Sequence, residues 1–286
     1  MATPSTISRW VIYTDLDGTL LDHHSYSWAA ARPALERLRE QRIPVVLTSS
    51  KTFPELVTLA AEIGLAYPII GENGAFVAWP DAFQLPASPD NASQGHRFKY
   101  FGSAHAAILS VLQKLRENPA FLFSGFSDWT VDELVGKTGL SAAAAAQARQ
   151  RQASEPILWQ GEESVLEDFR SALEEAGLVL VKGGRFHHVM GPTSKRQAME
   201  WLNRQLAQQC GEAPFFIALG DGPNDLEMLD VADVSVVVAN PDSDDILPRA
   251  HSLIRTQGVG PVGWNEAIIR LLEDSNNNGN SKDKNS

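Results

Sequence analysis

Two carboxylates spaced two residues apart, Asp15 and Asp17, end an apolar run that begins at Trp10. Such a run predicts a buried strand, and ligands of open α/β sheets bind beyond the carboxyl ends of the strands. Residues i and i+2 of a continuing strand share a face, but Gly18 allows the chain to bend at this point. The two carboxylates can therefore differ in task, one attacking as a nucleophile and the other moving protons.

Three further segments carry residues suited to the same chemistry. Ser49 and Ser50, with Lys51 beside them, follow a predicted strand, and Lys195 lies in the first turn of a predicted helix. The sequence Gly-Asp-Gly-Pro-Asn-Asp, residues 220–225, follows another predicted strand. Each segment alone fits an ordinary turn, helix cap or surface position. Because all of them fall at strand ends or helix starts, together they predict one site.

The residue types fit phosphoryl transfer, which requires the phosphate charge to be neutralised and an in-line attack to be aligned. Asp15 is the predicted nucleophile, forming an aspartyl-phosphate, and Asp17 the predicted general acid and base. Asp15, the backbone carbonyl of Asp17, and Asp221 offer the hard oxygen ligands that Mg²⁺ prefers. Ser49 and nearby backbone N–H groups can bind phosphate oxygens, and Lys195 adds a positive charge.

Asn224 and Asp225 follow a Gly-Pro turn that directs them back toward this site. Asp225 is either a third carboxylate on the metal or a residue that orients water and Lys195. We favour the second role, because Mg²⁺ usually keeps water between itself and some carboxylates.

The elements that must position these residues begin as a βαβα pattern and return to it after an insert. Thr52 and Glu55 predict a capping box, Gly64 a helix stop, and Asn73-Gly74 a hairpin turn. Pro80, Pro86 and Pro89 mark a connection to a mixed region. We therefore predict an α/β fold: a Rossmann-like, parallel-sheet core of residues 1–80 and 185–273, an inserted α+β cap of residues 81–184, and a disordered tail, residues 274–286.

Composition excludes several classes of partner. The chain of 286 residues has 24 basic and 35 acidic residues, a net charge of −11, which argues against nucleic acid and against anionic membranes. The single Cys210 suits a reducing compartment and is expected in the core. Residues 1–8 do not resemble a signal peptide, and no segment is apolar enough to cross a membrane, so a cytoplasmic location is expected. The oligomeric state stays open.

The motifs DLDGT and GDGPND, with a Ser after the second strand and a mid-chain Lys, resemble the four motifs of haloacid dehalogenase-like hydrolases. The resemblance implies a Mg²⁺-dependent phosphatase whose cap closes over small phosphorylated metabolites. The segments DLDGTLLDHHSYSW, SSKT, GENGA and TGLSAAAAAQARQRQASEPIL are also similar to the mannosyl-3-phosphoglycerate phosphatase family. This narrower resemblance implies hydrolysis of mannosyl-3-phosphoglycerate to phosphate and mannosylglycerate, a compatible solute.

A substrate of this kind carries a phosphate, a carboxylate and a hexose, so cationic, amide and carboxylate side chains are expected to bind it. The candidates are Ser50, Lys51, Asn73, Arg149, Arg151, Glu155, Arg185 and His188. Phe126 and Trp129 either stack on the sugar or pack in the core. We reject a metal site at His23 and His24, since Mg²⁺ prefers oxygen ligands, and we expect residues 23–28 to form a flap over the intermediate.

Three alternatives stay open at this point. The phosphatase can prefer glucosyl-3-phosphoglycerate or another sugar phosphate, since the residues do not identify the sugar. A phosphomutase would leave the phosphate on its product. A binding module without catalysis is disfavoured, because Asp15, Asp17, Lys195 and Asp221 are all present.

Overall fold

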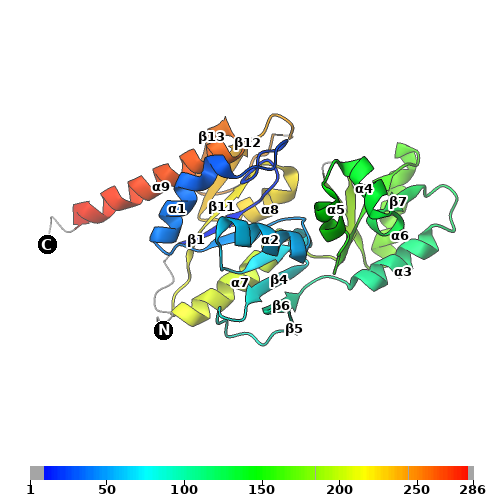
Figure 1. Cartoon of the computed structure of the whole chain (residues 1–286), viewed down its shortest axis with the longest axis horizontal. Coiled ribbons are helices and arrows are strands. Elements are labelled where there is room, and N and C mark those ends of the chain that lie inside the picture. Colours follow the sequence, from blue (N-terminus) through cyan, green and yellow to red (C-terminus); the bar gives the residue numbers. More distant parts are fainter. Residues whose placement is uncertain (1–9, 184, 244, 283–286) are drawn as a thin grey trace. The chain divides into compact units, whose positions relative to one another are not determined.

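The computed structural model describes residues 10–183, 185–243 and 245–282; Figure 1 labels many of its helices and strands, which are numbered in chain order. The chain divides into two compact units. One holds the described residues up to Leu47 together with those from Asn203 onward, and the other runs from Thr48 to Leu202. Residues 1–8, on which the prediction of no signal peptide rests, lie outside the described residues.

The first unit contains a parallel sheet with strand order β13-β12-β11-β1-β2. Thr14, the last residue of β1, pairs with Leu219 on one side and Leu47 on the other. Strands β1, β2 and β12 are apolar and buried along most of their length, as expected where helices cover both faces of a parallel sheet, whereas β13 alternates exposed and partly buried residues. Their bounds are β1 Trp10–Thr14, β2 Val45–Thr48, β11 Phe215–Gly220, β12 Val234–Ala239 and β13 Leu253–Val259.

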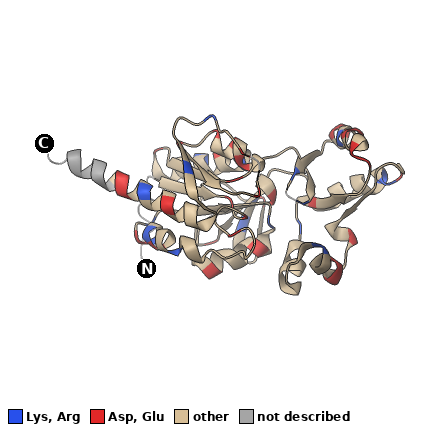
Figure 2. Cartoon of the chain, turned by 90° about the horizontal axis from the view of Figure 1, so that it is seen from above, with Lys and Arg blue, Asp and Glu red and all other residues tan. Residues whose placement is uncertain are grey.

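Helix α9 fastens this unit to its central strand. The fully buried indole of Trp264 donates from Nε1 to Oγ1 of Thr14 at 2.9 Å, and Asn265 Oδ1 accepts from the N–H of Ala34 at 3.0 Å. Basic and acidic residues alternate along α9 rather than forming one charged face (Figure 2). The helices here are α1 Arg32–Glu40, α8 Leu226–Leu229, α9 Pro261–Lys282, and α7 Lys195–Cys210, whose first half belongs to the second unit.

The second unit contains two sets of strands. In the first set, β3, β4, β6 and β5 lie in that order, and all three pairings are antiparallel. Helix α2 begins at the predicted capping box of Thr52 and Glu55 and ends at Gly64, whose φ of +81° requires glycine. The bounds are β3 Ile69–Gly71, β4 Phe76–Pro80, β5 Asn91–Ser93, β6 His96–Tyr100 and α2 Phe53–Ile63.

The other set is an antiparallel sheet of order β7-β8-β10-β9. Its core gathers Phe123, Ile157, Phe169 and Val189 with side chains of α3 and α6. The strands are β7 Phe123–Gly125, β8 Ser154–Trp159, β9 Val179–Lys182 and β10 His187–Met190. The helices are α3 His105–Leu115, α4 Val131–Thr138, α5 Ala142–Ala148 and α6 Leu166–Glu175.

The predicted α/β fold class is confirmed, whereas the predicted domain boundaries stay a prediction. Two details differ from expectation. Residues 274–282, expected to be disordered, continue α9, because a helix nucleated by its packed first turns gains one hydrogen bond for each residue added. Cys210, expected in the core, is exposed, since it is the last residue of α7 and lies beyond the buried Leu206. Among the described helices, none is long and apolar enough to cross a membrane.

Replacing Trp264 by Phe tests how strongly α9 is anchored. The variant loses the indole hydrogen bond and leaves a small cavity, so we expect the free energy of unfolding to fall by about 1–3 kcal/mol in urea titrations. Val262→Ala, at an exposed position of the same helix, is the control and should change it by less than about 0.5 kcal/mol. Equal effects of the two variants would contradict the anchoring role.

Candidate active site

Three buried carboxylates gather in the first unit. Asp15 follows β1, and Asp221 and Asp225 follow β11. One carboxylate oxygen of each lies within 4.8 Å of those of the other two. Asp15, Asp221 and Asp225 therefore lie together, and the catalytic and metal-binding roles predicted for them stay predictions.

Short hydrogen bonds fix this cluster to the backbone. The N–H of Asp15 donates to the carbonyl of Leu219 at 2.9 Å, which joins the loops after β1 and β11. Asp225 Oδ2 accepts from the N–H groups of Asp221 at 3.1 Å and Gly222 at 3.2 Å. Asp225 thus holds the Gly-Asp-Gly turn in shape, in keeping with the orienting role favoured for it.

Two residues that sequence reasoning missed hold Asp221 in place. Thr19 Oγ1 donates to Asp221 Oδ1, and Asn240 Nδ2 donates to Oδ2 at 2.7 Å. Gly18 is required between them: its φ is +83°, and a Cβ there would lie 2.4 Å from Asn240 Nδ2. A cavity of about 340 Å³ adjoins Asp221 and Asn240. A polar residue directly after β12 was the available signal for Asn240.

The other predicted residues of this unit lie outside the carboxylate cluster. The side chain of Asp17 is half-buried and does not belong to it. His23 and His24 are exposed, and His24 Nε2 lies 3.6 Å from Asp242 Oδ2; the expectation that they bind no metal stays a prediction. The flap role of residues 23–28 stays a prediction, as does the role of Asn224.

In the second unit, the loop Glu72–Gly74 fixes the predicted phosphate-binding residues. The N–H of Asn73 donates to the carbonyl of Ser49, and the N–H of Glu72 donates to that of Lys51, both at 3.0 Å. A Cβ at Gly74 would lie 2.1 Å from the Ser194 carbonyl oxygen and 2.7 Å from the Lys195 nitrogen. Ser49 and Lys195, both buried, are therefore fixed by one loop. Their predicted meeting with the carboxylates of the first unit stays a prediction.

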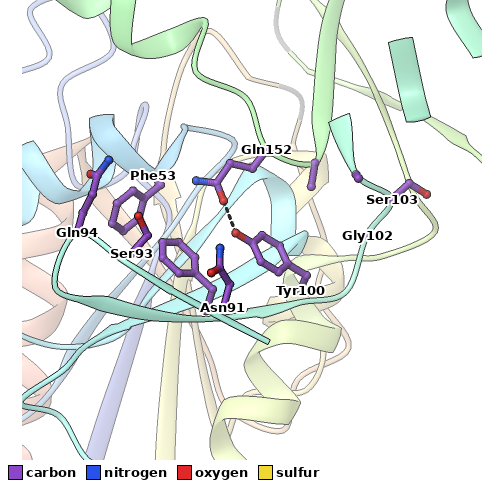
Figure 3. Close-up of a pocket in the computed structure, with 11 residues that line it drawn as sticks. Phe53, Asn91, Ser93, Gln94, Tyr100, Gly102, Ser103 and Gln152 are labelled. Carbon is purple, nitrogen blue, oxygen red and sulfur yellow. Dashed lines mark hydrogen bonds between the residues drawn. The ribbon is translucent and has the colours of Figure 1, made fainter. Parts of the chain in front are cut away.

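The carboxylate of Glu72, fully buried, holds the segment that connects α5 to β8. It accepts from the N–H groups of Gln152 at 2.8 Å and Ala153 at 3.0 Å, and from Ser154 Oγ at 2.6 Å. The side chain of Gln152 is held as well: Tyr100 donates to its Oε1 at 2.7 Å (Figure 3). Gln152 and Tyr100 both line a pocket of about 450 Å³ whose side chains are all uncharged.

The predicted substrate-binding residues of this unit have different surroundings. Glu155 is buried and accepts from His105 and from the backbone and hydroxyl of Ser127. Phe126 and Trp129 pack with Phe186 in a small core, so of the two roles considered for them, core packing and stacking on the sugar, the structure shows core packing. The exposed Arg185 donates to the carbonyl of Lys137, and the partly buried Arg149 to that of Phe126. Asn73 is buried, and its Oδ1 has no partner among the described residues.

His188 is the buried histidine of β10. Burial above all, together with the nearby charges of Arg151, His187 and Lys195, lowers its pKa to about 3. Its Nδ1 has no hydrogen-bond partner in the part of the chain that the structure describes. His188 is therefore neutral near pH 7 and marks a cationic neighbourhood formed by Arg151 and Lys195.

The fold and the carboxylate cluster define a hydrolase of the α/β class, and comparison with known proteins identifies its family. The model of the haloacid dehalogenase-like hydrolases matches residues 12–101 and 163–258, and the chain belongs to this family. A glucosyl-3-phosphoglycerate/mannosyl-3-phosphoglycerate phosphatase from Methanococcoides burtonii is 36% identical over 271 residues, covering 94% of this chain and 99% of that protein.

Solved structures share the fold at lower identity. A haloacid dehalogenase-like hydrolase from Bacteroides thetaiotaomicron is 20% identical with a TM-score of 0.65, over 91% of this chain and 98% of that one. The phosphatase BT1666 from the same organism is 16% identical with a TM-score of 0.64, over 94% and 97% of the two chains. These likenesses concern the fold alone.

Replacing Gly74 by Ala tests the loop that abuts Lys195. Alanine is strained at this position because the backbone is left-handed, and its Cβ would also collide with the backbone of Ser194. We therefore expect the free energy of unfolding to fall by about 3 kcal/mol or more. Gly95→Ala is the matched control: φ there is +73° with nothing within 4 Å, so only the backbone cost of about 1 kcal/mol is expected. Similar losses in urea titrations would contradict the close approach.

His188 makes the stability of the chain depend on pH. Since its folded-state pKa of about 3 lies below the ordinary value of 6.5, only the unfolded chain takes up this proton as the pH falls below 6.5. Protonation of His188 in the unfolded chain should lower the free energy of unfolding by about 2 kcal/mol between pH 7 and pH 5. In His188→Asn, urea titrations at the two pH values should no longer show this contribution. Val189→Ala, which removes no titrating group, should be destabilised equally at both. An unchanged slope in His188→Asn would contradict the assignment.

Proposed function

We propose that this chain is a Mg²⁺-dependent phosphatase that hydrolyses mannosyl-3-phosphoglycerate or glucosyl-3-phosphoglycerate to phosphate and the glycosylglycerate. The observation that carries the proposal is the cluster of three buried carboxylates, Asp15, Asp221 and Asp225, in a haloacid dehalogenase-like hydrolase. The choice of substrate is supported by the relative from Methanococcoides burtonii, which aligns over almost all of both chains and whose name carries both sugars. A cytoplasmic location is proposed with it, supported by the single cysteine of the sequence.

The carboxylate cluster suits a hard divalent cation. Its donors are oxygens, they are buried, and they lie within 4.8 Å of one another, where a cation offsets the mutual repulsion of the three charges. Asp15 and Asp221 would hold the ion together with the backbone carbonyl of Asp17. When bound, Mg²⁺ neutralises charge on the phosphate and on the attacking carboxylate.

The side chains divide the reaction between them. The Asp15 carboxylate attacks phosphorus and displaces the glycerate oxygen, to which Asp17 gives a proton. Asp17 then takes a proton from water, whose oxygen attacks the aspartyl-phosphate and releases inorganic phosphate. The hydroxyl of Ser49 and the ammonium group of Lys195 bind the phosphate oxygens in this proposal, both held by the Glu72–Gly74 loop.

Phosphate release from a panel of esters tests the proposed activity. Both glycosyl-3-phosphoglycerates should be hydrolysed with a kcat/KM far above that of simple hexose phosphates, EDTA should abolish turnover, and Mg²⁺ should restore it. Comparable rates on hexose 6-phosphates would reject the substrate assignment. A phosphorylated isomer, in place of free phosphate, would identify a phosphomutase.

Substitution of the two leading carboxylates tests the division of tasks. Asp15→Asn removes the nucleophile and should lower kcat at least about a thousandfold. Asp17→Asn should also lose turnover but accumulate some phosphoenzyme, detectable by mass spectrometry of the intact chain, because attack precedes the activation of water. The exposed Asp168→Asn on α6 is the control and should keep full activity. Full activity in Asp15→Asn would overturn the mechanism.

A further inference from the structure

Arg151 lies in the short segment between α5 and β8, and its guanidinium is fixed at one end. Nη1 donates to the carbonyl of Ser50 at 2.7 Å, and Nε donates to that of Ala148 at 2.9 Å. Its carbon centre lies 5.6 Å from the centroid of the Phe126 ring. The side chain is therefore held beside the loop that follows β2, next to the predicted phosphate-binding Ser49.

The other end of the guanidinium is available to a ligand. Nη2 carries two N–H groups for which the described residues provide no acceptor, and none of their carboxylates lies within 4 Å of Arg151. The guanidinium is half-buried, and the nearby charge of Lys195, in the same cationic neighbourhood, has the same sign. A cation in such a position is costly unless an anion pairs with it.

The other candidate arginines differ from Arg151 in both respects. Arg185 is exposed and donates to the carbonyl of Lys137, away from the Ser49–Lys51 loop. The side chain of Arg149 donates from Nε to the carbonyl of Phe126 at the long distance of 3.4 Å. Of the three, only Arg151 contacts the Ser49–Lys51 loop within the described residues.

We propose that Arg151 binds the carboxylate of the glycerate part of the substrate and thereby selects phosphoglycerate esters. The inference rests on the proposed function, since it assumes that the phosphate occupies the Ser49 loop. In a 3-phosphoglycerate the carboxylate is separated from the phosphate-bearing carbon by a single carbon, so the group that reads it must adjoin the phosphate site. A planar guanidinium with one open edge suits a carboxylate.

The segment around Arg151 is rigid enough to discriminate between ligands. Immediately after it, Gln152, Ala153 and Ser154 are held by the buried carboxylate of Glu72. The Gln152 side chain in addition accepts a hydrogen bond from Tyr100. Since the backbone is fixed before the ligand arrives, the guanidinium loses little freedom on binding.

A pair of matched esters tests the proposal. Glucosyl-3-phosphoglycerate and glucosylglycerol 3-phosphate differ only in that a hydroxymethyl group replaces the carboxylate. We expect Arg151→Met to lower kcat/KM about 100-fold for the first ester and less than about threefold for the second. Arg151→Lys keeps the charge without the planar fork and should lose about tenfold for the first ester alone. Arg116→Met, an arginine that lies over Phe123 in the same unit, should change neither.

The outcomes separate the two proposals. If the wild-type chain hydrolyses both esters and Arg151→Met loses equally on both, Arg151 does not read the carboxylate, and the inference is overturned. If the wild-type chain releases phosphate from neither ester, the proposed function fails instead. Should Arg151→Met not fold, calorimetry of Arg151→Lys with glucosylglycerate and with glucosylglycerol decides: weakened binding confined to glucosylglycerate supports the proposal, and equal affinities to wild type reject it.

Discussion

The buried carboxylate of Glu72 is the contact on which the functional part of the second unit depends. It lies in a loop where both Glu72 and Asn73 have positive φ values, 48° and 58°, a conformation that costs non-glycine residues about 1–3 kcal/mol each. The strained loop aims the backbone N–H groups of Glu72 and Asn73 at the Ser49–Lys51 loop and the carboxylate at residues 152–154. One loop thus contacts both the residues predicted to bind phosphate and the segment that carries Arg151.

The first unit follows a different strategy, since its site is made of like charges brought together. Asp15, Asp221 and Asp225 are all buried, and burial of three carboxylates within a few ångströms is unfavourable without a cation. Several hydrogen bonds position these carboxylates: Thr19 and Asn240 donate to Asp221, and backbone N–H groups donate to Asp225. These donors fix the positions of carboxylates that could hold a metal ion.

Local signals in the sequence predicted the helices and strands well, whereas contacts between residues far apart along the chain could not be predicted from it. Thr52, Glu55 and Gly64 act within one helix, so the capping box and the stop were predictable. The partners of Glu72 lie some eighty residues later, and GENG therefore indicated only a turn. Strand β10 was missed because His187 and His188 interrupt its apolar pattern, although His188 is buried. Arg149, Arg151 and Arg185 carry the same charge, so the sequence could not tell which of them is best placed to bind the substrate until their contacts were known.

The hydrogen bonds of Glu72 and Tyr100 to residues 152–154 limit how this enzyme can change its specificity. Because both Glu72 and Tyr100 hydrogen-bond to the segment, an insertion or deletion there would break several hydrogen bonds at once, whereas a side-chain replacement at position 151 leaves the backbone untouched. Protein engineers who transplant this segment between relatives would need to move its two anchors with it. Divergence of substrate choice in this part of the fold is expected to proceed by point substitution at a constant loop length.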